Sequence, residues 1–325
     1  MEKKATLNRN APYQLDSEVA EALGSFLSNH PPGEAAKKGD WQGLRDTAND
    51  FYKNLNLYLP VHEGIKRSAF FCFSKDGQEI TLRWYTKPGA GTGAAVVYVH
   101  GGGRLAGSVD LYDKIVADFV HRTDVAFLSV GYRLPPAGKD ESFAEDVLAA
   151  ITWLIDHAAE RGIDPERIAV MGDSGGGGIA ASAAMLARDR GIRLARQILL
   201  YPMLDDRTTV EDEALAPFAV WNYDSNYTGW KASMSAEPGS DDVSAAIVPM
   251  RQNRFEGLAP AYIVVGFLDI FRNENVAYAF SLLKSGVPVE LHIHPGVPHA
   301  FDFLAPESAV AKRAVADHIR VIRSI

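Results

Sequence analysis

Cysteine is almost absent from this sequence of 325 residues, because Cys72 is the only one. A single cysteine cannot form a disulfide within the chain, which excludes the disulfide-stapled secreted folds. Long apolar runs are missing too. No stretch approaches the roughly 18 residues of a membrane span, and the charged start at 1–10 has no signal-peptide core after it. We therefore expect a cytoplasmic protein without a membrane span.

An excess of positive charge is also missing. The sequence has 33 Lys and Arg residues against 41 Asp and Glu residues, a formal net charge of -8 and a pI near 5.6. No surplus of cations is left to pair with a phosphate backbone, which argues against nucleic acid as a partner. The apolar share of 47% and the charged share of 23% are ordinary for a globular protein with a large core. A mildly acidic soluble enzyme is the simplest expectation.

The first part of the chain, residues 13 to about 65, is predicted to be helical. Apolar residues recur at helix spacing from Leu15 to Phe26, and a second helical pattern runs from Trp41 to Phe51. The segment H-P-P-G at 30–33 separates the two helices, since proline and glycine interrupt helical structure.

From about residue 66 the pattern changes to short apolar strands that alternate with helices. The strands are predicted at 69–73, 80–85, 94–100, 125–132, 167–171, 197–201, 261–267 and 287–294. Helical patterns lie at 143–161, 177–189, 273–285 and 308–323. Because the middle and later strands are almost continuously apolar, helices should cover both faces of a mostly parallel sheet. The predicted fold class is therefore α/β, with a doubly wound eight-stranded sheet flanked by helices.

One strand is followed by a turn that is typical of a catalytic nucleophile. The apolar strand at 167–171 leads into G-D-S-G-G at 172–176, and a helix of small residues follows. A G-x-S-x-G turn between a strand and a helix lifts the serine side chain above the sheet, which favours Ser174 as a nucleophile. A phosphate-binding loop is disfavoured, because no lysine follows the glycines. The alternative is a glycine-rich turn in which Ser174 is incidental.

A second glycine run follows an earlier strand, in H-G-G-G at 100–103. Glycines here can aim backbone N–H groups at the negative oxygen of an ester-hydrolysis intermediate, the arrangement called an oxyanion hole. The predicted donors are the backbone N–H groups of Gly101, Gly102, Gly103 and Gly175. We expect His100 to orient the loop through hydrogen bonds and not to act as the catalytic base.

H-G-G-G followed by G-D-S-G-G-G resembles the hormone-sensitive-lipase-like esterases, the bacterial family IV carboxylesterases of the α/β-hydrolase fold. The resemblance covers about residues 70–325 and includes G-Y-R-L at 131–134 and Y-P-M-L-D at 201–205. It implies an N-terminal helical cap segment at 1–65 and a catalytic domain at 66–325. The stretch 205–257, which has no obvious strand, is then an insertion that lies over the sheet and contributes to the cap.

The resemblance also implies an acid and a base, in the chain order serine, acid, histidine. L-D-I-F-R-N-E at 268–274 is similar to the family's D-P-L-R-D-E, so Asp269 takes the role of the acid. The alternatives are that Asp269 only caps a helix or that Glu274 is the acid. P-G-V-P-H-A-F at 295–301 resembles the family's H-G-F or H-A-F loop and makes His299 the base. His292 and His294 lie on one face of a strand, but no third metal ligand is evident, so no metal is expected.

Two departures from the family lie beside these motifs. Gly175 stands where Ala or Ser is usual, and Arg104 stands where an aromatic or bulky residue is common. Arg104 is expected either to lie on a solvated rim or to contact a polar part of the substrate. Aromatic residues in and near the insertion are expected to line the substrate pocket or to form the insertion's own core. These are Trp221, Tyr223, Tyr227, Trp230 and Phe271, with Arg104, Trp221, Tyr223 and Phe271 as the pocket candidates.

The expected function is that of a serine carboxylesterase, which hydrolyses short- to medium-chain acyl esters through an acyl-enzyme and needs no cofactor. Its partner would be a small-molecule ester. The alternatives are an amidase or carbamate hydrolase with the same triad, or a member of the fold that binds a small molecule without catalysis. Family members often pair through the last strand and helix, which suggests a homodimer.

Overall fold

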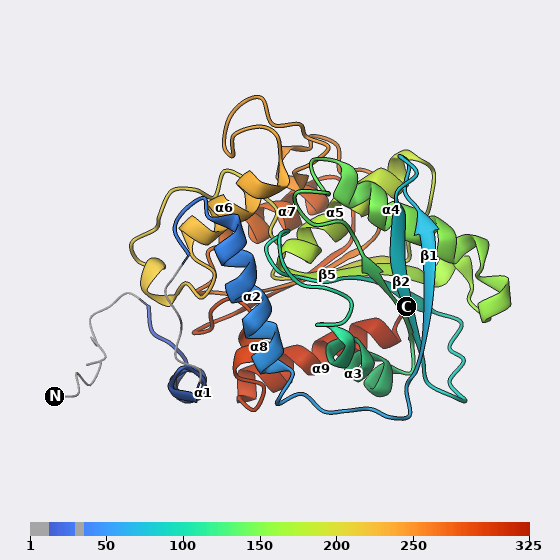
Figure 1. Cartoon of the computed structure of the whole chain (residues 1–325), viewed down its shortest axis with the longest axis horizontal. Helices are drawn as coiled ribbons and strands as arrows, with labels where there is room; N and C mark the ends of the chain where they lie inside the picture. Colours follow the sequence, from blue (N-terminus) through green and yellow to red (C-terminus); the bar gives the residue numbers. More distant parts are fainter. Residues whose placement is uncertain (1–12, 30–35) are drawn as a thin grey trace.

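The computed structural model describes residues 13–29 and 36–325. The charged start at 1–10 and the predicted helix break at 30–33 lie outside these residues. The described part contains an eight-stranded sheet with helices on both faces (Figure 1). No helix in the described part is long and apolar enough to cross a membrane.

Each predicted strand is confirmed by a strand that overlaps it. The strands are β1 (Lys66–Phe73), β2 (Glu79–Thr86), β3 (Ala95–Val99), β4 (Ala126–Gly131), β5 (Ile168–Asp173), β6 (Arg196–Leu200), β7 (Ala261–Gly266) and β8 (Val289–His294). Their order across the sheet is β1-β2-β4-β3-β5-β6-β7-β8. The pairs β1–β2 and β2–β4 are antiparallel and all others are parallel. The carboxyl ends of β5, β7 and β8 therefore meet at one edge, where ligands bind in open α/β sheets.

Two layers of helices enclose the sheet, as the apolar strands predicted. The larger helices of the body are α3 (Asp113–Thr123), α4 (Ser142–Asp156), α5 (Ser174–Asp189), α7 (Arg272–Lys284) and α9 (Ala309–Arg323). Helices α4, α5 and α7 share a buried cluster on one face, and α3 and α9 share another on the opposite face (Figure 1). Neighbouring residues of β3 belong to different clusters: Val96 packs in the cluster that contains α3, and Val97 packs in the cluster that contains α4. This alternation is expected of a strand that is buried on both faces.

Helix α3 was not predicted from the sequence. The sequence does contain the apolar pattern of this helix: Ile115, Val116 and Phe119 recur at helix spacing, lie on one face and are all buried. Asp113 in its first turn and Arg122 in its last turn also suit the helix dipole.

The N-terminal helices lie in two different places. Helix α1 (Ser17–Asn29) packs through Val19 against the C-terminal part of the chain, next to the short helix α8 (Phe301–Leu304). Helix α2 (Trp41–Leu55) begins at Asp40, whose carboxylate accepts a hydrogen bond from the Gly43 amide at 3.0 Å, a favourable N-cap. It packs against α6 (Tyr223–Ser233), the helix of the 205–257 stretch (Figure 1). Helices α2 and α6 thus pack together although they come from two distant parts of the sequence, and we call this pair of helices the lid.

Candidate active site

Ser174 stands at the junction of β5 and α5, in the left-handed conformation with φ of 52°. This conformation costs a residue with a side chain about 1 to 2 kcal/mol, so it must be imposed by its surroundings. The neighbouring glycines allow the close packing that imposes it. A Cβ on Gly172 would lie 2.5 Å from the Gly176 carbonyl oxygen, and one on Gly176 would lie 2.2 Å from the His100 carbonyl oxygen.

The structure brings Ser174, His299 and Asp269 together in one chain of hydrogen bonds. His299 Nε2 lies 2.9 Å from Ser174 Oγ, and Nδ1 lies 2.7 Å from Asp269 Oδ2. With the proton on Nδ1 donated to the carboxylate, Nε2 is free to accept the serine proton. All three residues are buried. The second carboxylate oxygen, Oδ1, accepts a hydrogen bond from the Phe271 amide at 2.9 Å, which fixes the carboxylate plane.

Two aromatic rings hold the imidazole from its sides. The Tyr201 ring meets the His299 ring edge to face at 4.9 Å, and the Phe271 ring does so at 5.2 Å. Tyr201 was missed as a site residue, although it begins the Y-P-M-L-D segment at 201–205. Its hydroxyl donates a hydrogen bond to Asp302 Oδ1 at 2.9 Å, so the ring itself is held in place.

The glycine run at 101–103 lies beside the nucleophile in left-handed backbone, with φ of 113° at Gly102 and 58° at Gly103. In the described residues the N–H groups of Gly102, Gly103 and Gly175 donate to no other protein group. The prediction for Gly101 is wrong, because its N–H donates to Asp173 Oδ1 at 3.1 Å. Three of the four predicted donors therefore remain available to an oxyanion.

Asp173, the residue before the nucleophile, was also missed by sequence reasoning. Its buried carboxylate accepts hydrogen bonds from the Tyr98 hydroxyl at 2.8 Å, the Tyr112 hydroxyl at 2.7 Å and the Gly101 amide. The Tyr112 hydroxyl in turn lies 2.7 Å from the Tyr52 hydroxyl on α2. Burial raises the pKa of Asp173 to about 6, although these hydrogen bonds act in the opposite direction. A hydrogen-bond network thus runs from the nucleophile turn to the lid.

A cavity of about 330 Å³ lies over Ser174 and His299. Its floor includes Gly102 and Gly103. One wall is formed by α2 through Leu44, Thr47, Ala48, Phe51 and Tyr52. A second part of the wall is formed by Val220, Trp221, Asn222 and Ser225, at the start of α6. The cavity is therefore an apolar chamber with the hydrogen-bonded triad at its base, and Trp221 is the one predicted pocket residue that lines it.

The other three pocket candidates do not line this cavity. Tyr223 is buried in the core under α6, and Phe271 is fully buried behind His299. Arg104 is only 1% exposed, so both expectations for it are wrong: it lies neither on a solvated rim nor in the pocket. Its guanidinium is packed between the Phe143 ring at 4.6 Å and the Trp230 ring at 4.8 Å. Burial lowers the pKa of Arg104 to about 10, so it keeps its charge at neutral pH.

The remaining titratable candidates have structural partners elsewhere. Glu274 Oε1 accepts hydrogen bonds from the backbone of Leu204 at 2.6 Å and Asp205 at 3.3 Å, and burial raises its pKa well above the usual range. The His100 ring donates to the Gly101 carbonyl oxygen at 2.9 Å, the loop-orienting contact that was expected. His292 lies 2.7 Å from Glu290. In the described part of the chain, no group of three or more His, Cys, Asp or Glu side chains is arranged to hold a metal ion.

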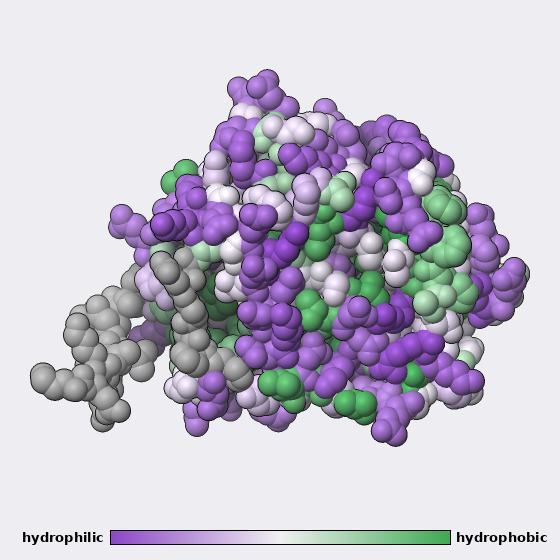
Figure 2. All heavy atoms as spheres, viewed as in Figure 1, coloured by the Kyte–Doolittle hydropathy of each residue, from purple (hydrophilic) through white to green (hydrophobic). Residues whose placement is uncertain are grey.

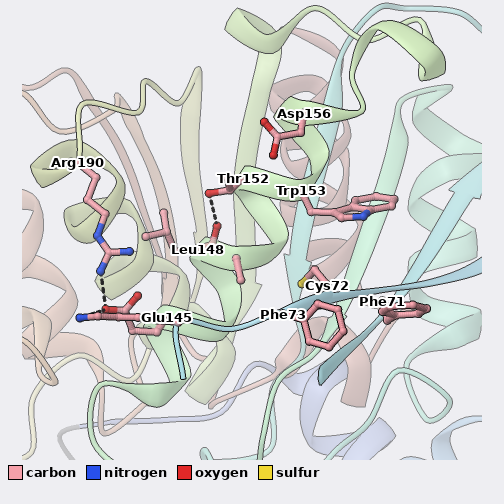
Figure 3. A pocket seen from close by; sticks show the side chains of 11 residues that line it. Phe71, Cys72, Phe73, Glu145, Leu148, Thr152, Trp153, Asp156 and Arg190 are labelled. Atoms are coloured by element: carbon pink, nitrogen blue, oxygen red, sulfur yellow. Dashed lines mark hydrogen bonds and ion pairs between the residues drawn. The ribbon is translucent and has the colours of Figure 1, made fainter. Parts of the chain in front are cut away.

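A larger hollow of about 570 Å³ opens between β1 and α4 (Figure 3). The side chains of Phe71 and Phe73 project beside it from β1, which is the edge strand, and are 55% and 61% exposed. Figure 2 shows apolar side chains gathered over this strand, at the right of the molecule. The hollow holds an Arg190–Glu145 ion pair but none of the triad residues.

Residues 96–303 match the model of a protein family that has the α/β-hydrolase fold. The chain belongs to this family. Within it, the chain is one of the hormone-sensitive-lipase-like carboxylesterases, as its motifs indicated. It is 33% identical to an ethyl acetate hydrolase of Pseudomonas putida over 70% of this chain and 73% of that one. It is 35% identical to the esterase LipI of Mycobacterium tuberculosis over 66% of this chain and 68% of that one.

Solved structures agree with this family membership. A bacterial heroin esterase superimposes with a TM-score of 0.84 at 32% identity, over 96% of this chain and 98% of that one. The alignment includes the N-terminal region that the family match at 96–303 leaves out.

Proposed function

We propose that this hydrolase is a serine carboxylesterase that cleaves short- to medium-chain acyl esters through an acyl-enzyme on Ser174. One observation carries the proposal. Ser174 Oγ lies 2.9 Å from His299 Nε2 at the base of an apolar cavity, beside backbone N–H groups of the glycine turn that donate to no other group in the described part of the chain. This is the geometry that nucleophilic attack on an ester carbonyl requires.

The mechanism follows from the positions of these groups. His299 takes the proton of Ser174 as Oγ forms a bond to the carbonyl carbon, and the carbonyl oxygen becomes an oxyanion. The N–H groups of Gly102, Gly103 and Gly175 would hold that oxyanion. The C–O bond to the alcohol then breaks, and His299 gives its proton to the departing alcohol. A water molecule then attacks the acyl-enzyme through the same steps and releases the carboxylic acid. Asp269 stabilises the imidazolium in both halves of the reaction.

The size and chemistry of the cavity support a small substrate. A volume of about 330 Å³ is near the lower end of small-molecule sites. Its walls expose apolar carbon from Leu44, Ala48 and Phe51, which suits an alkyl chain better than a charged group. The names of similar proteins, an ethyl acetate hydrolase among them, point to the same class of substrate.

The triad alone does not distinguish esters from amides, so the test must do so. A panel of p-nitrophenyl esters from acetate to dodecanoate is compared with matched p-nitroanilides. We expect acetate to hexanoate esters to give the highest kcat/KM, with a fall beyond hexanoate as the chain outgrows the cavity. A preference for the anilides would contradict the esterase proposal and favour an amidase.

We also propose that two copies pair through the β8 edge of the sheet. Three exposed apolar residues follow one face of α7 at helix spacing, namely Val276, Phe280 and Leu283. Ile293 of β8, 40% exposed, lies on the same side of the sheet as α7. Light scattering on a size-exclusion column should give twice the chain mass, and Phe280→Glu should give the monomer mass. A monomeric wild type would contradict the pairing.

A further inference from the structure

The side chain of Arg104 is the feature next to the active site that the proposed mechanism leaves unused. Its guanidinium lies between Phe143 of α4 and Trp230 of α6, at 4.6 Å and 4.8 Å from the ring centres. Nε–H donates to Ser233 Oγ of α6 at 3.1 Å. In the described residues no carboxylate lies within ion-pair distance of it, although it is only 1% exposed and Asp140 acts on it electrostatically from farther away. A buried cation without a counterion in direct contact is costly, so a specific contact must compensate for it.

The backbone of Arg104 continues the turn that presents the oxyanion donors. Gly102, Gly103 and Arg104 have φ of 113°, 58° and 64°, three left-handed residues in a row. Glycine adopts this conformation freely, whereas arginine does so only when its surroundings hold it there. Arg104 is the one member of the three with a side chain that can be held.

Helix α6 packs closely against the same turn. A Cβ added to Gly229 of α6 would lie 2.6 Å from the Gly103 carbonyl oxygen, and one added to Gly103 would lie 2.3 Å from the Trp221 ring. On the other side, a Cβ on Gly175 would lie 2.5 Å from the Arg104 nitrogen. The turn is therefore enclosed between the start of α5 and the lid helix α6, and Arg104 is the side chain that joins it to α6.

The chain contains a second arginine with the same packing but no link to the turn. Arg161 lies 4.7 Å from the Phe70 ring and 4.5 Å from the Trp153 ring, and Trp153 lines the hollow of Figure 3, which holds no triad residue. Its side chain is 12% exposed. Any effect that comes only from removing a buried arginine between two aromatic rings should appear equally at Arg161, which makes it a matched control.

We propose that Arg104 is a positioning residue, whose guanidinium fixes the left-handed turn that presents the Gly102 and Gly103 amides and ties that turn to the lid helix α6. The expected effect on rate rests on the proposed esterase function. The expected effect on the order of the turn does not. Arg104 acts through the oxyanion donors, so it should affect the transition state more than the bound substrate.

The kinetic test compares Arg104→Met with Arg161→Met on p-nitrophenyl butyrate. Loss of the Arg104 guanidinium should lower kcat by about 10- to 100-fold, because a small misplacement of catalytic groups can cost about 100-fold in rate. KM should change by less than about 3-fold. Affinity for an alkyl trifluoromethyl ketone, which forms an oxyanion adduct with the serine, should fall in parallel with kcat/KM. Affinity for the matched alcohol should not fall. Arg161→Met should lower the Tm and leave kcat unchanged.

The structural test measures amide hydrogen exchange in the peptide 101–107 of each variant and the wild type. Arg104→Met should speed exchange there and Arg161→Met should not. If Arg104→Met does not fold, Arg104→Lys, which keeps the charge but not the planar stacking group, must show the same changes to a smaller degree. Unchanged kcat with unchanged exchange at 101–107 would overturn the proposal. A wild type without ester hydrolysis would overturn the proposed function instead, and the exchange data would still decide whether Arg104 holds the turn.

Discussion

The floor and the walls of the cavity are built in different ways. The floor consists of Ser174, His299 and the glycine turn, with Asp269 bonded to His299 behind it, and each of these residues lies in a segment that follows the end of a strand. Its groups are held by backbone geometry and by hydrogen bonds of 2.7 to 2.9 Å. The walls come from α2 and the start of α6, two segments far from each other in sequence. From this comparison we expect the floor to set the rate of reaction and the walls to select the substrate.

Polar contacts join both lid helices to the rest of the molecule. The Gly107 amide donates to Asn49 Oδ1 of α2 at 2.9 Å, and Tyr52 of α2 meets Tyr112 in the network around Asp173. Most of the wall surface is apolar side chain, which can be exchanged without breaking a hydrogen bond. A change in the floor should therefore lower kcat for every ester, and a change in the walls should alter the preference among esters.

The largest effect is expected from Asp269→Asn. An amide at this position favours the wrong tautomer of His299, and the corresponding loss in other triad enzymes is about 10,000-fold in kcat. KM should change by less than about 3-fold. Glu274→Gln is the control, because Glu274 accepts hydrogen bonds from the 204–205 backbone and not from His299. Equal losses in the two variants would show that Asp269 has no special part in catalysis.

A single added carbon in the floor should have the next largest effect. In Gly175→Ala the new Cβ would lie 2.5 Å from the Arg104 backbone nitrogen and 3.0 Å from Gly103, so the oxyanion turn must move. We expect kcat to fall by about 10- to 100-fold for all esters alike. Gly24→Ala, in open space on α1, should leave kcat unchanged. Wild-type activity in Gly175→Ala would mean that the floor is more adaptable than this account allows.

A change in the walls should act on one group of substrates. Ala48→Phe places a ring in the cavity from α2, and should raise KM for the hexanoate ester by about 10-fold, the effect of roughly one or two lost methylene contacts. The acetate ester should keep its kcat within about 2-fold. Gln42→Phe, on the exposed side of the same helix, serves as the control. A uniform loss across all chain lengths would contradict the division between floor and walls.

The last prediction concerns stability and tests the network that joins floor to lid. The pKa of Asp173 is about 6 in the folded protein, above its value of about 4 in an unfolded chain. The folded state therefore binds the proton more tightly, and this contribution to stability is lost as the pH rises from 4 through 6. Asp173→Asn carries no charge at any pH, so it should gain about 2 kcal/mol over the wild type between pH 4 and pH 7. Denaturant unfolding at both pH values measures this, and a constant difference would contradict the raised pKa.

The contrast between floor and walls also explains what the sequence could predict. The middle and later strands are almost continuous apolar runs, and the G-x-S-x-G turn directly after one of them predicted the place of Ser174. Asp269 and His299 followed from the resemblance to the esterase family, which implied an acid and a base later in the chain. The structure then showed contacts that no sequence pattern predicts. One of them is the hydrogen bond that the Gly101 amide donates to the Asp173 carboxylate. That pairing depends on a contact between the end of β5 and a loop residue 72 positions earlier in the chain.

The walls were predicted poorly for a physical reason. An aromatic residue in an irregular segment can face the cavity, as Trp221 does, or the core beneath it, as Tyr223 does two positions later. The direction depends on how α6 packs, and composition does not reveal it. Arg104 is the clearest case, because a charged residue in a glycine-rich loop suggests solvent, whereas aromatic rings from α4 and α6 enclose it.

Covalent labelling of Ser174 tests the central claim most directly. The purified protein is treated with one equivalent of an alkyl fluorophosphonate, and intact and peptide mass spectrometry locate the adduct. We predict one phosphonyl group per chain, on Ser174, with none in Ser174→Ala and a rate at least about 1000-fold lower in His299→Ala. Folded wild-type protein that remains unlabelled, or that is labelled at another residue, would contradict the claim that Ser174 is the activated nucleophile of this hydrolase.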